Sequence, residues 1–131
     1  PLTAYNRAFA QEGRPTNPEP PTAAELRSYI HEQTGTMVTD DSVEWNGTTT
    51  IVEEYRTIIG VLIDGGYLKE DMLPFGKLNR RYIIAGTPEH IDGEEMEAPS
   101  EVRPGFFVEC NNATPKKTRY IHRLISTIAQ E

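Results

Sequence analysis

The sequence lacks the features that define several common protein classes. Its 131 residues include one cysteine, Cys110, which excludes an internal disulfide framework and fits a reducing compartment. No apolar run reaches the length of about 18 residues that a membrane-spanning helix needs. The first residues, PLTAYNRAFAQEG, lack the basic end and apolar core of a secretory signal. We therefore expect an intracellular protein, cytoplasmic or nuclear, that makes no contact with a membrane.

Motifs for catalysis are also missing. The chain has no phosphate-binding GxxxxGK[ST] loop, no GxGxxG after a predicted strand, and no HExxH, GxSxG or CxxC. His31, His90 and His122 are too widely spaced to form a local metal site. Cys110 would become a nucleophile only if His90 or His122 folded beside it. We therefore predict no enzymatic activity, no metal and no cofactor.

Positive charge is scarce. Thirteen Lys and Arg residues stand against twenty Asp and Glu residues, so the formal net charge is −7. This balance argues against general coating of nucleic acid, because phosphate binding needs clustered cations. The negative charge is concentrated, with −4 in residues 22–47 and −6 in residues 86–109, whereas residues 48–85 are neutral and residues 110–131 carry +3. The candidate binding elements therefore lie in the two latter segments.

The first 21 residues differ from the remainder. Leu2 to Glu12 shows helical spacing of apolar residues, and the following GRPTNPEPP contains four prolines in nine residues. Proline fixes φ and removes a backbone donor, which favours an extended chain. We predict a partly extended arm over residues 1–21 and a single domain over residues 22–131, with an acidic surface loop at residues 86–104.

A first helix is predicted over residues 22–34. Thr22 and Glu25 form a capping box at its start, and Gly35 supplies its end. Its apolar face consists of Leu26, Tyr29 and Ile30. Residues 36–47 permit two interpretations: a short helical turn capped by Asp40 or Asp41, or two short strands formed by MVT and VEW.

A second helix is predicted from Thr50 to the glycine pair Gly65-Gly66. Its apolar residues fall at i, i+4, i+7, i+8, i+11 and i+12, which is one stripe of an amphipathic helix; they are Ile51, Tyr55, Ile58, Ile59, Leu62 and Ile63. A hairpin follows, with a first strand at residues 67–69 and a return strand from Arg80 to Ala85. The tip region of this hairpin is basic and carries Lys77, Arg80 and Arg81.

The C-terminal part predicts a short buried strand at residues 106–108 and a final helix. Thr114 and Pro115 form an N-cap and N1 pair for that helix. Its apolar stripe consists of Tyr120, Ile121, Leu124, Ile125 and Ile128. Its cations fall mostly on the other faces; they are Lys116, Lys117, Arg119 and Arg123.

The helix, glycine stop and hairpin at residues 55–84 resemble the second half of a winged helix-turn-helix domain. Tyr55, Ile59 and Leu62 match the buried positions of a recognition helix, and Gly66 matches its terminal glycine. The resemblance covers residues 22–85 and requires residues 40–47 to supply the short second helix. It implies an α+β fold with a winged-helix-like core of three helices, a two- or three-stranded hairpin, and here an additional C-terminal helix.

The resemblance also implies DNA binding, with the recognition helix in the major groove and the wing on the backbone or in the minor groove. The expected contacts are Thr48, Thr49, Thr50, Arg56, Lys77, Arg80, Arg81, Lys116, Lys117 and Arg119. Glu53 and Glu54 oppose this interpretation, because adjacent carboxylates on the reading face repel phosphates. Many winged helices contact proteins instead. The alternative is therefore a module for protein interaction or homodimerisation that has no affinity for nucleic acid.

Overall fold

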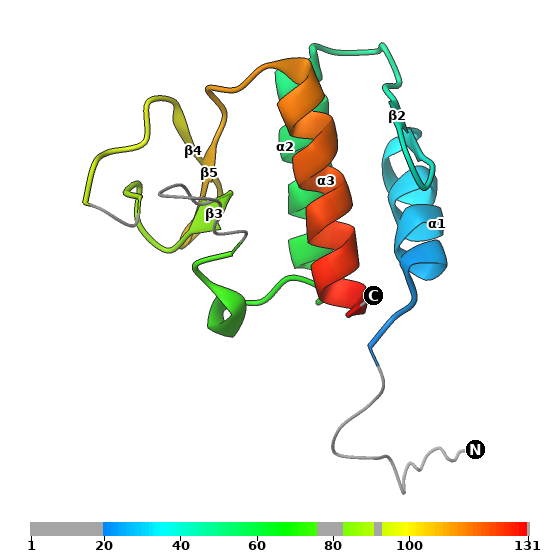
Figure 1. Ribbon diagram of the computed structural model, residues 1–131, viewed down its shortest axis with the longest axis horizontal. Coiled ribbons are helices and arrows are strands. Elements are labelled where there is room, and N and C mark those ends of the chain that lie inside the picture. Colours follow the sequence, from blue (N-terminus) through cyan, green and yellow to red (C-terminus); the bar gives the residue numbers. More distant parts are fainter. Residues whose placement is uncertain (1–19, 76–82, 91–92, 131) are drawn as a thin grey trace, which may run out of the picture.

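The computed structural model describes residues 20–75, 83–90 and 93–130. The predicted α+β class is confirmed: the described elements, in chain order, are α1 (Ala23–Thr34), β1 (Met37–Val38), β2 (Val43–Glu44), α2 (Ile51–Asp64), a 3-10 helix (Glu70–Met72), β3 (Ile84–Ala85), β4 (Pro99–Arg103), β5 (Phe106–Glu109) and α3 (Thr114–Ala129). In Figure 1, α2 and α3 run in one direction and α1 runs in the other. The three-stranded sheet lies on the opposite side of α2 and α3 from α1. The predicted helix at residues 2–12 and the basic hairpin tip lie outside the described residues.

The predicted boundaries of α1 are confirmed. The Thr22 hydroxyl accepts the Glu25 amide at 3.1 Å, and the Glu25 carboxylate accepts the Thr22 amide at 2.8 Å, so the capping box is complete. The helix ends at Gly35, which has a φ of 80° that costs glycine little. Leu26 and Ile30 are fully buried. They pack α1 into the core that it shares with α2 and α3.

Residues 36–47 form strands, so the helical interpretation of this segment is wrong. β1 and β2 pair antiparallel, with Val38 opposite Val43. The Thr39 hydroxyl accepts the Ser42 amide at 3.0 Å and closes the turn between the strands. His122 of α3 holds this turn, because its Nε2 lies 3.0 Å from the Thr39 carbonyl oxygen and 3.1 Å from that of Ser42. A hairpin therefore occupies the place where the winged-helix resemblance requires a second helix.

A buried carboxylate connects this hairpin to α2. Glu54 is 6% exposed, and its Oε1 accepts the Asn46 amide at 2.5 Å and the Thr36 hydroxyl at 3.1 Å. Its Oε2 accepts the Gly47 amide at 2.9 Å. The Thr50 hydroxyl caps the same helix end. Glu54 thus provides an acceptor for the buried Thr36 hydroxyl and for two partly buried backbone amides.

The apolar stripe of α2 forms the centre of the core. Tyr55, Ile58, Ile59 and Leu62 are fully buried as predicted, whereas Ile51 and Ile63 at the helix ends are half-buried. α2 ends against α1, since a Cβ on Gly65 would lie only 2.5 Å from the Tyr29 hydroxyl oxygen. This close approach explains why glycine stands at the helix end.

The three-stranded sheet is antiparallel in the order β3-β5-β4. The predicted strand at residues 67–69 is absent, because the amides of Tyr67 and Leu68 both donate to the Leu62 carbonyl oxygen in the turn that ends α2. The 3-10 helix follows at residues 70–72, and Phe75 is the residue that bridges to Ile84. The predicted buried strand at residues 106–108 is confirmed as part of β5, with Val108 fully buried. β4 occupies residues 99–103, so only part of the predicted acidic loop is irregular.

Glu109 explains why β4 forms within that acidic segment. Its carboxylate is buried and accepts the amides of Glu97 and Ala98 at 2.9 Å each and that of Asn111 at 3.1 Å. The Nε2 of His90, also buried, lies 3.0 Å from the same carboxylate. One side chain at the end of β5 therefore fixes the residues that lead into β4.

α3 begins at Thr114, with Ala113 as its N-cap and no side chain bonded to the helix end, so the prediction of Thr114 as the cap is wrong by one residue. The predicted apolar stripe is confirmed. Ile121, Leu124, Ile125 and Ile128 are buried, and Tyr120 is half-buried. The opposite face of α3 is exposed.

We predict that Glu54→Gln lowers the free energy of unfolding by about 1.5–3 kcal/mol, the cost of losing hydrogen bonds to a buried charged group. Both carboxylate oxygens accept backbone amides, so one of these amides would face the NH₂ group of glutamine in either orientation. Urea unfolding measures the change. Glu53→Gln is the matched control, since Glu53 is exposed on the same helix turn and its pair with Arg56 is worth well under about 1 kcal/mol. Equal stability of the two variants would contradict the prediction.

We also predict an acid-dependent loss of stability through Glu109. Burial raises its pKa, but hydrogen bonds from Ala98, Glu97, His90 and Asn111 outweigh burial and hold the pKa below its ordinary value. A carboxyl whose pKa is lower in the folded state stabilises the fold above its unfolded pKa, and this stabilisation is lost as pH falls through its folded pKa. Urea unfolding between about pH 6 and pH 3 should therefore show a decline in stability.

The Glu109→Gln variant should be less stable near neutral pH and show a flatter pH dependence over that range. Glu95→Gln is the control, because Glu95 is an exposed acid in the same segment. A pH dependence that is equally steep in the Glu109 variant would assign the acid sensitivity to other groups.

Candidate nucleic-acid interface

The predicted contacts at the start of α2 lie on the surface. Thr48, Thr49 and Thr50 are exposed. The Thr50 hydroxyl accepts the Glu53 amide at 3.2 Å, and the Thr48 hydroxyl accepts the Asn46 side-chain amide at 3.2 Å. The Thr49 hydroxyl donates to the Thr50 carbonyl oxygen at 3.4 Å, so all three hydroxyls already make local hydrogen bonds.

The outer face of α2 carries charges that compensate one another. Arg56 is half-buried, and its Nη1 lies 3.4 Å from the Glu53 carboxylate. Both line a hollow of about 220 Å³ between α2 and β4, which Glu101 and Arg103 also border. Arg103 binds Asp64 through two hydrogen bonds of 2.8 and 2.6 Å, which hold the pKa of Asp64 below its ordinary value. Such a face offers little net attraction to a phosphate backbone.

Glu54 does not contribute to that face. The sequence placed it beside Glu53 as a second repelling acid, but its carboxylate is buried and accepts hydrogen bonds within the chain. Only Glu53 of the pair is exposed to an approaching ligand.

The exposed face of α3 has a different charge. The helix contains four cations and no acidic residue. Lys116, Arg119 and Arg123 are exposed and recur at i, i+3 and i+7, which places them along one side of the helix over about 10 Å. We call these three residues the α3 basic row. None of the three has an ion-pair partner within the part of the chain that the structure describes.

Lys117 does not belong to this row, although the sequence placed it among the contacts. It is 3% exposed, and its Nζ donates to the carbonyl oxygens of Cys110 and Asn112. The ammonium also lies 5.6 Å from the centroid of the Tyr55 ring. Burial lowers the pKa of Lys117. Its charge is used to hold the segment before α3 and is not available to an external ligand.

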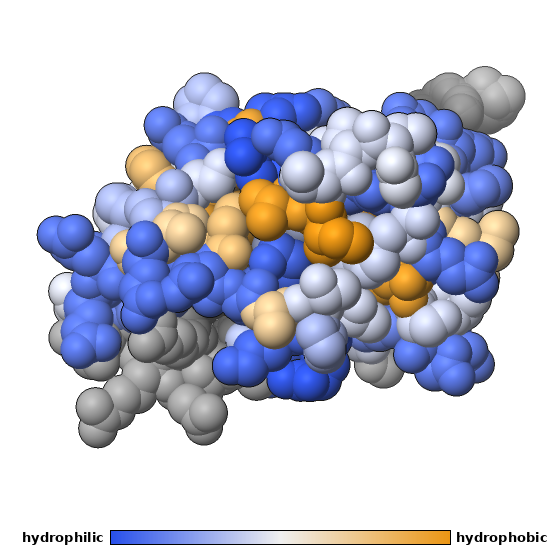
Figure 2. All heavy atoms as spheres, turned by 90° about the horizontal axis from the view of Figure 1, so that it is seen from above, coloured by the Kyte–Doolittle hydropathy of each residue, from blue (hydrophilic) through white to orange (hydrophobic). Residues whose placement is uncertain are grey.

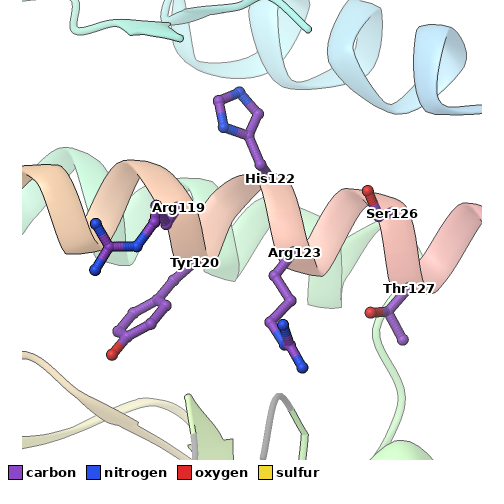
Figure 3. Close-up of a pocket in the computed structure, with 6 residues that line it drawn as sticks. All are labelled: Arg119, Tyr120, His122, Arg123, Ser126 and Thr127. Atoms are coloured by element: carbon purple, nitrogen blue, oxygen red, sulfur yellow. The ribbon is translucent and has the colours of Figure 1, made fainter. Parts of the chain in front are cut away.

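A hollow of about 560 Å³ lies beside the α3 basic row. Its described lining comes from α3 alone and contains no acid; it consists of Arg119, Tyr120, His122, Arg123, Ser126 and Thr127. Figure 3 shows Arg119, Tyr120 and Arg123 projecting from the same side of the helix, with His122 directed to the opposite side. Sequence reasoning included Arg119 but missed the role of Arg123, which the four-residue spacing between them could have indicated.

The predicted wing cations, Lys77, Arg80 and Arg81, lie outside the described residues.

The described residues give no support for catalysis at Cys110. Burial raises the pKa of its thiol, which favours the protonated and poorly nucleophilic form, and its Sγ lies 3.8 Å from the Val108 carbonyl oxygen. No group of three or more metal-binding side chains occurs within residues 20–75, 83–90 and 93–130. In the same residues, no helix has the length and apolar character needed to cross a bilayer.

We predict that substitutions of the neighbouring residues Lys116 and Lys117 have different effects on the free energy of unfolding. Lys117→Met removes two charge-assisted hydrogen bonds in a buried site, and we expect it to lower the free energy of unfolding by about 1.5–3 kcal/mol. Lys116→Met is the matched control, because this exposed side chain should change stability by less than about 0.5 kcal/mol. Thermal and urea unfolding of both variants provide the measurement. A stable Lys117 variant would contradict the structural role.

The candidate interface is identified from its side chains alone, because comparison with known proteins gives no match. No family model matches the sequence, and neither the curated proteins nor the solved structures contain a significant match. Three features mark the face of α3: the α3 basic row, the hollow beside it, and the absence of acids from the described residues of both. This face is the candidate interface.

Proposed function

We propose that the chain is a DNA-binding domain and that the exposed face of α3 makes the principal contact with phosphates. The observation that carries the proposal is the α3 basic row, which has no acid on its helix and no ion-pair partner among the described residues. Uncompensated, clustered cations are what phosphate binding requires. The hydroxyls of Ser126 and Thr127 continue the same surface with further groups that bind phosphate oxygens.

The proposal modifies the role expected from the winged-helix resemblance. In that resemblance, α1 and α2 would correspond to the first helix and the recognition helix, and the bridge from Phe75 to Ile84 would correspond to the wing. The β1–β2 hairpin stands in place of the second helix. Because the outer face of α2 carries compensated pairs, we propose that α3, which lies outside the resemblance, takes over the contact with DNA.

The acidic charge of the rest of the domain favours binding with the α3 face turned toward DNA. A chain with a net charge of −7 is repelled by DNA at most approaches, so that attraction is limited to its basic face. The distribution of exposed apolar side chains favours the alternative, a protein-interaction module, less than it favours DNA binding. The exposed large hydrophobics among the described residues are dispersed over β1, α2 and the 3-10 helix; they are Met37, Val52 and Met72.

Figure 2 views the molecule from above, at the end where α2 and α3 begin. Its surface is largely hydrophilic, with a short apolar strip near the centre. An obligate protein interface is usually a larger apolar area. The end of the molecule seen in Figure 2 therefore offers no extended apolar area to a permanent protein partner.

We predict that the double variant Arg119→Ala with Arg123→Ala weakens binding to a fluorescently labelled DNA duplex and makes it less dependent on salt. Each phosphate contact contributes about −0.9 to the slope of log K against log salt concentration, so the slope should fall in magnitude by about 1.8. Fluorescence anisotropy titrations between about 50 and 200 mM salt give the slopes.

The matched control is Arg27→Ala with Lys69→Ala, which removes the same charge from α1 and from the segment after α2. The control should keep the wild-type slope. Equal slopes for both double variants would refute the assignment to α3. A further double variant, Arg80→Ala with Arg81→Ala, measures the share of the predicted wing. A discrete dimer without affinity for DNA would favour the protein-interaction alternative.

A further inference from the structure

The hollow beside α3 is larger than contact with a phosphate backbone requires. Its volume of about 560 Å³ lies within the range of about 300–1,000 Å³ that is typical of sites for small molecules. A duplex presents its phosphates from a convex surface, and phosphate contacts need only exposed cations. The hollow therefore calls for an occupant with a part that enters it.

The side chains that line the hollow indicate which part of a ligand would enter it. Tyr120 is half-buried, packs against the core and also lines the hollow. Arg119 and Arg123 project on the same side of the helix as this ring and lie on either side of it (Figure 3). Aromatic rings and guanidinium planes stack on nucleic-acid bases, and guanidinium groups also pair with phosphates.

The helix that carries these side chains is held on both sides by the fold. His122, which also lines the hollow, lies within 3.1 Å of the carbonyl oxygens of Thr39 and Ser42 and so connects α3 to the β1–β2 turn. The ring body of Tyr120 and the apolar stripe of α3 connect the helix to the core. A site on such a supported helix is formed before the ligand arrives, which reduces the ordering cost of binding.

We infer that the hollow takes an unpaired nucleotide of single-stranded nucleic acid, with its base against the Tyr120 ring and its flanking phosphates on Arg119 and Arg123. The inference rests on the proposed function and specifies its substrate, a single strand in preference to a duplex. Paired bases are stacked inside a duplex and cannot enter the hollow, whereas the bases of a single strand can. The described lining contains no acid, and an aromatic ring can stack on any base, so we expect binding to depend little on base identity.

The test uses the full chain with three fluorescently labelled ligands of equal length. These are an oligothymidylate, a strand with the same sugar-phosphate backbone but no bases, and a duplex. Stacking on an aromatic side chain is worth about 1–3 kcal/mol per base, which corresponds to about 5- to 150-fold in affinity. We expect the oligothymidylate to bind more tightly than the abasic strand by a factor in this range. This comparison requires no substitution.

Two variants then test whether the Tyr120 ring causes the difference in affinity between oligothymidylate and the abasic strand. Tyr120→Leu keeps apolar volume against the core but removes the stacking surface, so it should bring the affinity for oligothymidylate down to that of the abasic strand. Its salt slope should stay at the wild-type value, because no charge is lost. Tyr120→Phe retains the ring and should retain the difference. Thermal unfolding of each variant verifies that it is folded.

The outcomes separate this inference from the proposed function. If the three ligands bind equally and Tyr120→Leu changes none of them, the single-strand inference is overturned while DNA binding by α3 stands. If no ligand binds at low salt, both fail. Tighter binding of an acidic peptide, such as oligoglutamate of the same charge, than of any nucleic acid would overturn both in favour of a protein partner.

Discussion

Two buried carboxylates hold the irregular parts of this fold in place. Glu54 accepts the Thr36 hydroxyl just before β1 and two backbone amides between β2 and α2. Glu109 accepts three backbone amides around the ends of β4 and β5. Short strands and loops of this kind have few ladder hydrogen bonds of their own. The two carboxylates supply charged acceptors for these partly buried amides, and such a hydrogen bond contributes about 1.5–3 kcal/mol. The position of the β1–β2 hairpin and of β4 therefore depends on these two side chains.

The same two residues change how the net charge should be understood. A count over the sequence treats Glu54 and Glu109 as surface acids that repel an anionic ligand, but the fold uses both internally. Lys117 is the converse case, since its cation is enclosed by the backbone before α3. The charge available to a ligand is set by which side chains remain outside. On α3 these are Lys116, Arg119 and Arg123.

The sequence was informative where structure is determined by neighbouring residues. The capping box at Thr22 and the apolar stripes of α2 and α3 depend on spacings of three and four positions, so these helices could be predicted within one or two residues. The hairpin at residues 37–44 depends on His122, about 80 positions away, and β4 depends on Glu109. Contacts at that separation leave no local pattern, which is why both segments were ambiguous or wrongly assigned.

The candidate site shows the same division between local and distant determinants. Arg119 was predictable because a helix without acids could be recognised from the sequence, and the i, i+4 relation adds Arg123 to it. That Lys117 turns inward and Lys116 outward could not be predicted from composition, because the carbonyls of Cys110 and Asn112 decide it. The amphipathic helix therefore has a double role. Its apolar stripe is anchored in the core, and this anchoring presents Arg119, Tyr120 and Arg123 together on the exposed side.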